Sequence, residues 1–142
     1  MEAPKQQKAV LVQLRSKIQH PGQPAETHEM QATGQIIEKK GQAYLLFEEQ
    51  IEGMPSVRTT VKLHAEDAFI MRKGGVQMRL PFRTDDARFG TYGNGPAIMD
   101  LLVETKKLQW TQGSFSVAYD LHAEGNLLGK YQLTITYSEV TK

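Results

Sequence analysis

The chain has 142 residues, of which 39% are hydrophobic, and its 17 Lys and Arg residues are balanced by 16 Asp and Glu residues. A chain of this length is expected to form one domain with a hydrophobic core. Its formal net charge of +1 argues against a disordered protein and against a nucleic-acid binder. The absence of cysteine excludes disulfides, thiolate metal ligands and a cysteine nucleophile.

The first residues, MEAPKQQ, lack the charged and then apolar pattern of a secretory signal peptide. The longest apolar run, residues 43–47, is too short to cross a bilayer. We therefore expect a cytoplasmic protein without membrane association.

Alternation of apolar and polar residues with a period of two dominates the first half of the chain, and this pattern predicts β-strands with one buried face. His20-Pro21-Gly22-Gln23-Pro24 interrupts the first strand, and Glu38-Lys39-Lys40-Gly41 predicts a turn between the second and third. The strands predicted here are 10–18, 29–37, 42–49, 57–64 and 68–73.

Gly74-Gly75 predicts a two-residue hairpin turn, because glycine tolerates positive φ. The following strand is predicted to present Val76, Met78, Leu80 and Phe82 on its apolar face. Pro81 cannot donate a ladder hydrogen bond, so it indicates a sheet edge or a bulge.

Residues 89–97, FGTYGNGPA, hold three glycines within six positions. A phosphate-binding loop would need Lys and Ser or Thr after the last glycine, or the order G-x-G-x-x-G before a helix. Here Pro96-Ala97 follows, and the next segment alternates as a strand. We therefore predict a flexible corner at the rim of a β structure, with Tyr92 as its most notable side chain.

The C-terminal part predicts three further strands. Met99, Leu101 and Val103 form the apolar face of a strand over 98–104, and a helix over 100–110 is a weaker alternative. Two longer strands, 115–122 and 130–138, are joined by a Gly/Asn link at 124–126.

About nine strands with short connections predict an all-β fold, a single antiparallel up-and-down β-barrel of about 8–10 strands. Closure into a barrel removes exposed strand edges. We expect one domain over 1–142, with an ordered barrel from about 8 to 138 and short polar termini.

The order and spacing of several segments together match a known family: Thr59-Thr60-Val61-Lys62, Ile70 to Met78 (IMRKGGVQM), Phe82, Thr91-Tyr92-Gly93, Met99, Tyr119-Asp120-Leu121-His122 and Leu133-Thr134-Ile135-Thr136-Tyr137. On these segments the chain resembles the YwiB-like family of bacterial proteins, a family of unknown function with a calycin-like (lipocalin-like) β-barrel. The resemblance covers essentially the whole chain, and it implies a barrel of eight to ten antiparallel strands but no activity or site residues.

The large apolar side chains of the strands are predicted to point into the barrel. A barrel of eight strands can be filled by such side chains or can hold one small ligand, so both a filled core and a cavity are open alternatives. The inward set is Phe47, Val61, Leu63, Met78, Phe82, Phe115, Val117, Tyr119, Leu133, Ile135 and Tyr137.

Three residues are the candidates for ligand binding. Arg72 shares the parity of Ala68 and Ile70 next to a turn, so it is either a solvated strand end or a rim residue that binds a carboxylate or phosphate. Tyr92 and Tyr119 could present polar hydroxyls to a partly apolar ligand.

Asp120 and His122 share one face of their strand and could form an acid–base pair if that face pointed inward, but the polar face is expected to be the outer wall. No histidine pair has metal-site spacing, and we predict no catalytic residue, metal or cofactor. The sequence favours a non-enzymatic binder of a small, partly apolar ligand, which a rim arginine could bind if the ligand is anionic. The alternative is a protein-interaction or structural module that forms a homodimer, and an enzyme ranks last.

Overall fold

The structure of the chain is a computed structural model that describes residues 6–50, 52–53, 55–94 and 96–140. Within these residues, no helix is long and apolar enough to cross a membrane. Every regular element in the described ranges is a β-strand. The strands are β1 (Gln6–Gln19), β2 (Glu26–Lys39), β3 (Gln42–Glu49), β4 (Val57–Leu63), β5 (Ala68–Gly74), β6 (Gln77–Phe82), β7 (Arg88–Asn94), β8 (Ala97–Thr111), β9 (Ser114–Ala123) and β10 (Asn126–Glu139).

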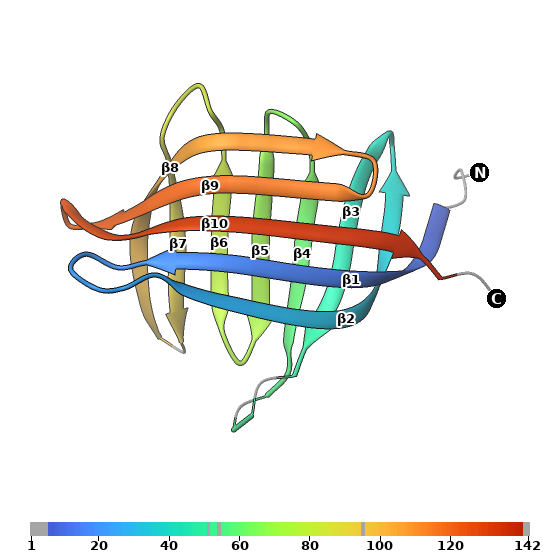
Figure 1. The fold of residues 1–142 in the computed structure, drawn as a ribbon, viewed down its shortest axis with the longest axis horizontal. Coiled ribbons are helices and arrows are strands. Elements are labelled where there is room, and N and C mark those ends of the chain that lie inside the picture. The colour runs from blue at the N-terminus through green and yellow to red at the C-terminus, as the bar shows by residue number, and fades with distance from the viewer. Residues whose placement is uncertain (1–5, 51, 54, 95, 141–142) are drawn as a thin grey trace.

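The strands form a closed antiparallel barrel in which each strand pairs with its neighbours in the chain and β1 pairs with β10. Figure 1 shows β1, β9 and β10 running across the front, while β4, β5 and β6 cross steeply behind them. The long strand β8 belongs to both layers, because residues 97–103 pair with β7 and residues 102–111 pair with β9. The predicted all-β antiparallel barrel is confirmed.

Residues 88–94 form strand β7, so the prediction of a flexible corner is wrong for residues 89–94. Gly90 lies in the strand where a Cβ atom would collide with the backbone carbonyl of Arg79 on β6. Gly93 is similarly close to the carbonyl of Ala97 on β8. The two glycines therefore allow close approach of neighbouring strands rather than a turn. Gly95, the third glycine of the stretch, lies outside the described residues.

Two other strand boundaries differ from the predictions. The β5–β6 turn falls at residues 75–76, because Gly74, with a φ of 116°, is still the last residue of β5. Val76 therefore lies in the turn rather than on the apolar face of β6. Strand β8 continues past residue 104 to Thr111 through a bulge between Thr105 and Lys107, and this excludes the helical alternative.

All the side chains predicted to point inward belong to the core of the barrel or pack against it. Each large apolar side chain that is fully buried contributes about 1.5–3 kcal/mol to folding. Phe47, Val61, Leu63, Phe82, Phe115, Val117, Tyr119 and Ile135 are buried, and Met78, Leu133 and Tyr137 are partly buried against them.

The barrel has two distinct ends. At the terminal end, β1 begins and β10 ends, together with the β2–β3, β4–β5, β6–β7 and β8–β9 connections. The opposite end, which we call the cavity end, carries the β1–β2, β3–β4, β5–β6, β7–β8 and β9–β10 connections.

Candidate functional site

The interior of the barrel is hollow toward the cavity end. The hollow has a volume of about 640 Å³, within the range of about 300–1,000 Å³ that is typical of small-molecule sites. Its wall consists mainly of inward apolar side chains from strands on both layers. They include Leu14, Ile18, Met30, Ile70, Met78 and Leu133. Of the two alternatives that the sequence left open, a cavity describes this half of the barrel.

Aromatic rings form a continuous row from the packed core to the mouth of the cavity. The ring of Phe82 lies 4.8 Å from the ring of Tyr119, and Tyr119 stacks on Tyr131 at 5.1 Å with an interplanar angle of 7°. His20 contacts the other side of Tyr131 edge-on at 6.4 Å. Tyr119 and Tyr131 line the cavity, so this row contributes aromatic carbon to its wall.

Both tyrosines of this row keep their protons at neutral pH. Burial raises the pKa of Tyr119 above its ordinary value, and the neighbouring Tyr131 raises it further, while Arg72 opposes the shift. Burial also raises the pKa of Tyr131. The two hydroxyls are therefore neutral hydrogen-bonding groups beside the cavity.

An ion pair lies inside the wall of the cavity. Arg72 of β5 donates from Nη2 to Oε2 of Glu49 at the end of β3, and the two side chains are 25% and 11% exposed. Both residues line the cavity. The predicted solvated strand end is therefore the wrong alternative for Arg72, since its guanidinium is fixed by a carboxylate within the barrel.

Two polar atoms next to this ion pair have no partner. Thr59 of β4 is directly opposite Arg72 in the ladder and is only 4% exposed. Its hydroxyl Oγ1 and the Nε of Arg72 are both buried and make no hydrogen bond within the part of the chain that the structure describes. Both residues line the cavity. One acceptor group in the cavity could accept from both the hydroxyl and the guanidinium.

The predicted site residues do not all meet. Arg72 and Tyr119 both line the cavity, whereas Tyr92 does not and is 43% exposed. Tyr92 nevertheless belongs to the same cross-strand row as Arg72, with Met78 between them on β6. Tyr92 therefore lies on β7, two strands away from Arg72 on β5.

Sequence reasoning did not select Thr59, Glu49 or Tyr131 as site residues. Thr59 interrupts the apolar face of its strand, and Glu49 continues the inward parity of Leu45 and Phe47. A polar residue at an inward position near a strand end is the signal that could have found both.

A second hollow lies at the terminal end, with a volume of about 770 Å³. It is lined by Trp110 and Tyr137 together with charged residues of β1 and β10. Four of its polar side chains form two pairs, because Trp110 Nε1 donates to the hydroxyl of Tyr137 at 2.9 Å and Lys8 pairs with Glu139 at 3.0 Å. It therefore offers no unpaired buried group to a ligand within the described residues.

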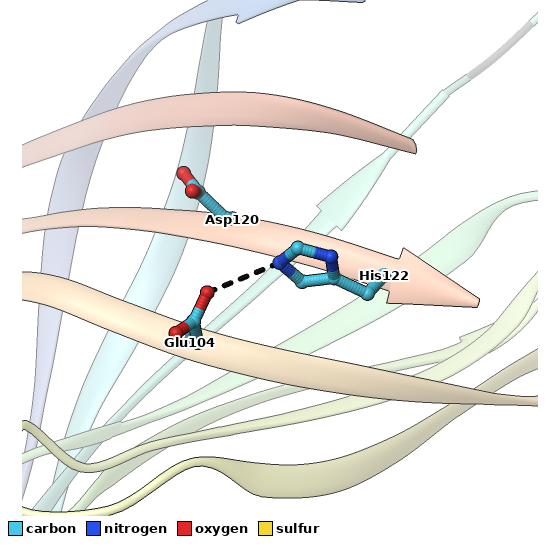
Figure 2. Close-up of side chains that lie close together, drawn as sticks. All are labelled: Glu104, Asp120 and His122. Carbon is cyan, nitrogen blue, oxygen red and sulfur yellow. Dashed lines mark hydrogen bonds and ion pairs between the residues drawn. The ribbon is translucent and has the colours of Figure 1, made fainter. Parts of the chain in front are cut away.

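Asp120 and His122 lie on the outer wall, because Tyr119 and Leu121, which alternate with them, line the cavity. His122 Nε2 is 3.1 Å from Oε1 of Glu104 on β8, whereas Asp120 contacts Lys130. Figure 2 shows Glu104 reaching toward His122 with Asp120 beside them. An acid–base pair of Asp120 and His122 inside the barrel is thus not formed.

Comparison with known proteins identifies relatives that share this barrel. The chain is 28% identical over 137 residues to the uncharacterized beta-barrel protein YwiB of Bacillus subtilis, covering 94% of this chain and 95% of that protein. The crystal structure of the YwiB protein matches with a TM-score of 0.82 at 27% identity, over 95% of this chain and 94% of that one. Residues 12–135 match the model of the domain of unknown function DUF1934. The chain therefore belongs to the DUF1934 family of β-barrel proteins.

Proposed function

We propose that this protein is a non-enzymatic binder of a small, partly apolar ligand, which it holds inside the cavity end of the barrel. The ligand carries a head group that accepts hydrogen bonds, such as a carboxylate. The proposal includes a cytoplasmic location, which the absence of cysteine supports.

The observation that carries the proposal is the pair of unpartnered atoms, Thr59 Oγ1 and Arg72 Nε, in the wall of an apolar cavity. A buried polar group without a partner costs about 1–3 kcal/mol. A ligand oxygen placed between these two atoms would remove that cost. Glu49 supports this geometry, because it accepts from Nη2 of the same guanidinium and so fixes its position.

The rest of the cavity specifies the body of the ligand. The stacked rings of Tyr119 and Tyr131 contribute aromatic carbon to the wall, and the aliphatic side chains of Leu14 and Ile70 contribute other parts of it. An aromatic or short aliphatic body with a head group that accepts hydrogen bonds fits this combination of surfaces.

The test uses 8-anilinonaphthalene-1-sulfonate, a fluorescent probe with an apolar aromatic body and an anionic head group. We expect saturable binding of one probe per chain. Thr59→Val keeps the shape of the side chain but removes the hydroxyl, and it should weaken binding about two- to tenfold. Arg72→Met should weaken it by about tenfold or more, because a charge-assisted hydrogen bond is lost.

Two matched variants control this experiment. Arg58→Met removes an arginine that pairs with Glu48 on the outer face of the neighbouring strand, so it should leave binding unchanged. Ser16→Trp should fill the cavity, since Ser16 lines it, and should abolish binding while the β-sheet circular dichroism is retained. Equal binding by the wild type and Ser16→Trp would place the probe elsewhere and contradict the proposal.

The second candidate is a homodimer without an internal ligand. The observation that favours it is the exposure of two apolar side chains on the β7–β8 hairpin, where Phe89 is 76% exposed and Ile98 is also exposed. Sedimentation velocity of the wild type and of Phe89→Asp tests it. A dimer that the substitution dissociates supports this candidate, and a monomer at every concentration excludes it.

A further inference from the structure

The outer wall of the barrel holds a cluster of one histidine and two carboxylates, separate from the cavity. Glu104 of β8 and Asp120 of β9 are directly opposite each other in the ladder. His122 is two residues from Asp120 on the same face of β9. One ligand atom from each residue lies within 4.8 Å of the other two.

This arrangement places two carboxylates side by side, and the protein offsets their charges only with His122 and with two exposed lysine side chains, Lys106 and Lys130. Like charges directly opposite each other destabilise an antiparallel pair. The cost is increased here because Asp120 is only 8% exposed although it belongs to the outer wall.

The charge of Asp120 is poorly compensated by the protein itself. Within the part of the chain that the structure describes, its carboxylate makes a single contact, from Oδ2 to Nζ of Lys130 at 3.5 Å. That distance is at the outer limit of a hydrogen bond. The other carboxylate oxygen makes no hydrogen bond to the described residues, although the side chain is only 11% exposed.

We propose that Glu104, Asp120 and His122 form a binding site for a divalent cation of the first transition row, such as Zn²⁺. An imidazole with two carboxylates favours such an ion over Mg²⁺ or Ca²⁺, which prefer oxygen ligands alone. Three ligand atoms around one zinc ion lie about 3.3 Å apart, which follows from metal–ligand distances of about 2.0–2.2 Å. Small side-chain rotations would bring the three donors to that spacing, and water would occupy the remaining coordination position.

The register of the two strands explains why a histidine-spacing search misses this site. Asp120 and His122 supply two ligands from one strand, but the third comes from the preceding strand of the hairpin. Strands hold such ligands more rigidly than loops do. The cation would replace the contacts of Lys106 with Glu104 at 3.7 Å and of Lys130 with Asp120 at 3.5 Å, both from exposed lysine side chains.

The experiment is a calorimetric titration of the tag-free full chain with ZnCl₂ after dialysis against a chelator. We expect one zinc ion per chain and a higher unfolding temperature in its presence. Asp120→Asn and His122→Ala should each weaken binding by about tenfold or more, because each removes a direct ligand. A parallel titration with CaCl₂ should show no binding at this site.

Two further variants make the result specific. Lys130→Met removes the competing ammonium group and should tighten zinc binding roughly two- to fivefold, which a purely structural ion-pair network would not predict. His28→Ala disrupts the exposed contact between His28 and Glu26 at 3.5 Å on β2, and it should leave zinc binding unchanged.

The proposal is overturned if the wild type binds no zinc, or if His122→Ala binds zinc as tightly as His28→Ala does. His122 is only half-buried, so His122→Ala tests the site even if Asp120→Asn fails to fold.

Discussion

The two hollows at opposite ends of the barrel have similar volumes but differ in how their polar groups are satisfied. At the terminal end, the indole of Trp110 donates to the hydroxyl of Tyr137. At the cavity end, the hydroxyl of Thr59 and the Nε of Arg72 are buried without partners in the described part of the chain. Other large side chains of the core line neither hollow and are fully buried, including Phe82, Phe115, Leu45 and Val103.

This difference shows that volume alone does not identify a binding site in a barrel. The hollow at the terminal end is the larger of the two, about 770 Å³ against about 640 Å³. However, native proteins pair almost all their buried polar groups, so an unpaired group usually has a specific reason. Among the described residues, such groups line the hollow at the cavity end and not the hollow at the terminal end, and this is why we propose the cavity end as the binding site.

The largest loss of stability is expected from a substitution among the fully buried side chains that line neither hollow. Phe115→Ala should lower the free energy of unfolding by about 3–5 kcal/mol, because Phe115 is completely buried and its loss leaves a void. Met78→Ala should cost only about 1 kcal/mol, since Met78 is partly buried and already faces the cavity. Urea unfolding of both variants measures the two costs, and equal losses would show that the cavity end is as tightly packed as the middle of the barrel.

Most of this fold could be predicted from the sequence, because the inward and outward residues of nine strands alternate clearly. Strand β7 was missed because Gly90 and Gly93 have no side chains to contribute to the alternation. The reason for the two glycines is a tertiary contact, since a side chain at either position would collide with a carbonyl of the neighbouring strand.

The sites were less predictable than the strands. Arg72 and Tyr119 could be found from their parity, but their proximity depends on how the barrel closes. The cluster of Glu104 with Asp120 and His122 depends on the register of the β8–β9 hairpin, which includes a bulge between Thr105 and Lys107. A shift by one residue would turn Glu104 to the other face, and a sequence pattern does not fix such a shift.

The second prediction concerns the alkaline stability of the cavity wall. An unfolded tyrosine ionises near pH 10, whereas burial raises the pKa of Tyr119 in the folded barrel. The stabilisation that this shift provides is therefore complete below pH 10, and it is lost as the pH rises above 10. The slope for this one group is about 1.4 kcal/mol per pH unit at most.

Tyr119→Phe should remove this part of the alkaline loss, whereas Tyr44→Phe, a change on the outer face of β3, should retain it. The measurement is the free energy of unfolding in urea between pH 9 and pH 11. An unchanged slope in Tyr119→Phe would show that the hydroxyl of Tyr119 ionises as readily in the folded barrel as in the unfolded chain.

The smallest changes in the free energy of unfolding should have opposite signs for substitutions in the two hollows. Tyr137→Phe leaves Nε1 of Trp110 without its acceptor and should lower the free energy of unfolding by about 1 kcal/mol. Thr59→Val instead removes a hydroxyl that has no partner while keeping the β-branched shape, so it should leave stability unchanged or raise it by up to about 1 kcal/mol. Thr134→Val on the exposed outer face of β10 controls for the intrinsic strand preference of valine.

If Thr59→Val destabilised the barrel as much as Tyr137→Phe, the hydroxyl of Thr59 would already be satisfied in solution, and the polar contrast between the two hollows would disappear. If it stabilises the barrel and also weakens binding of the probe, the chain retains Thr59 at a cost in stability, as expected of a residue that contacts a ligand.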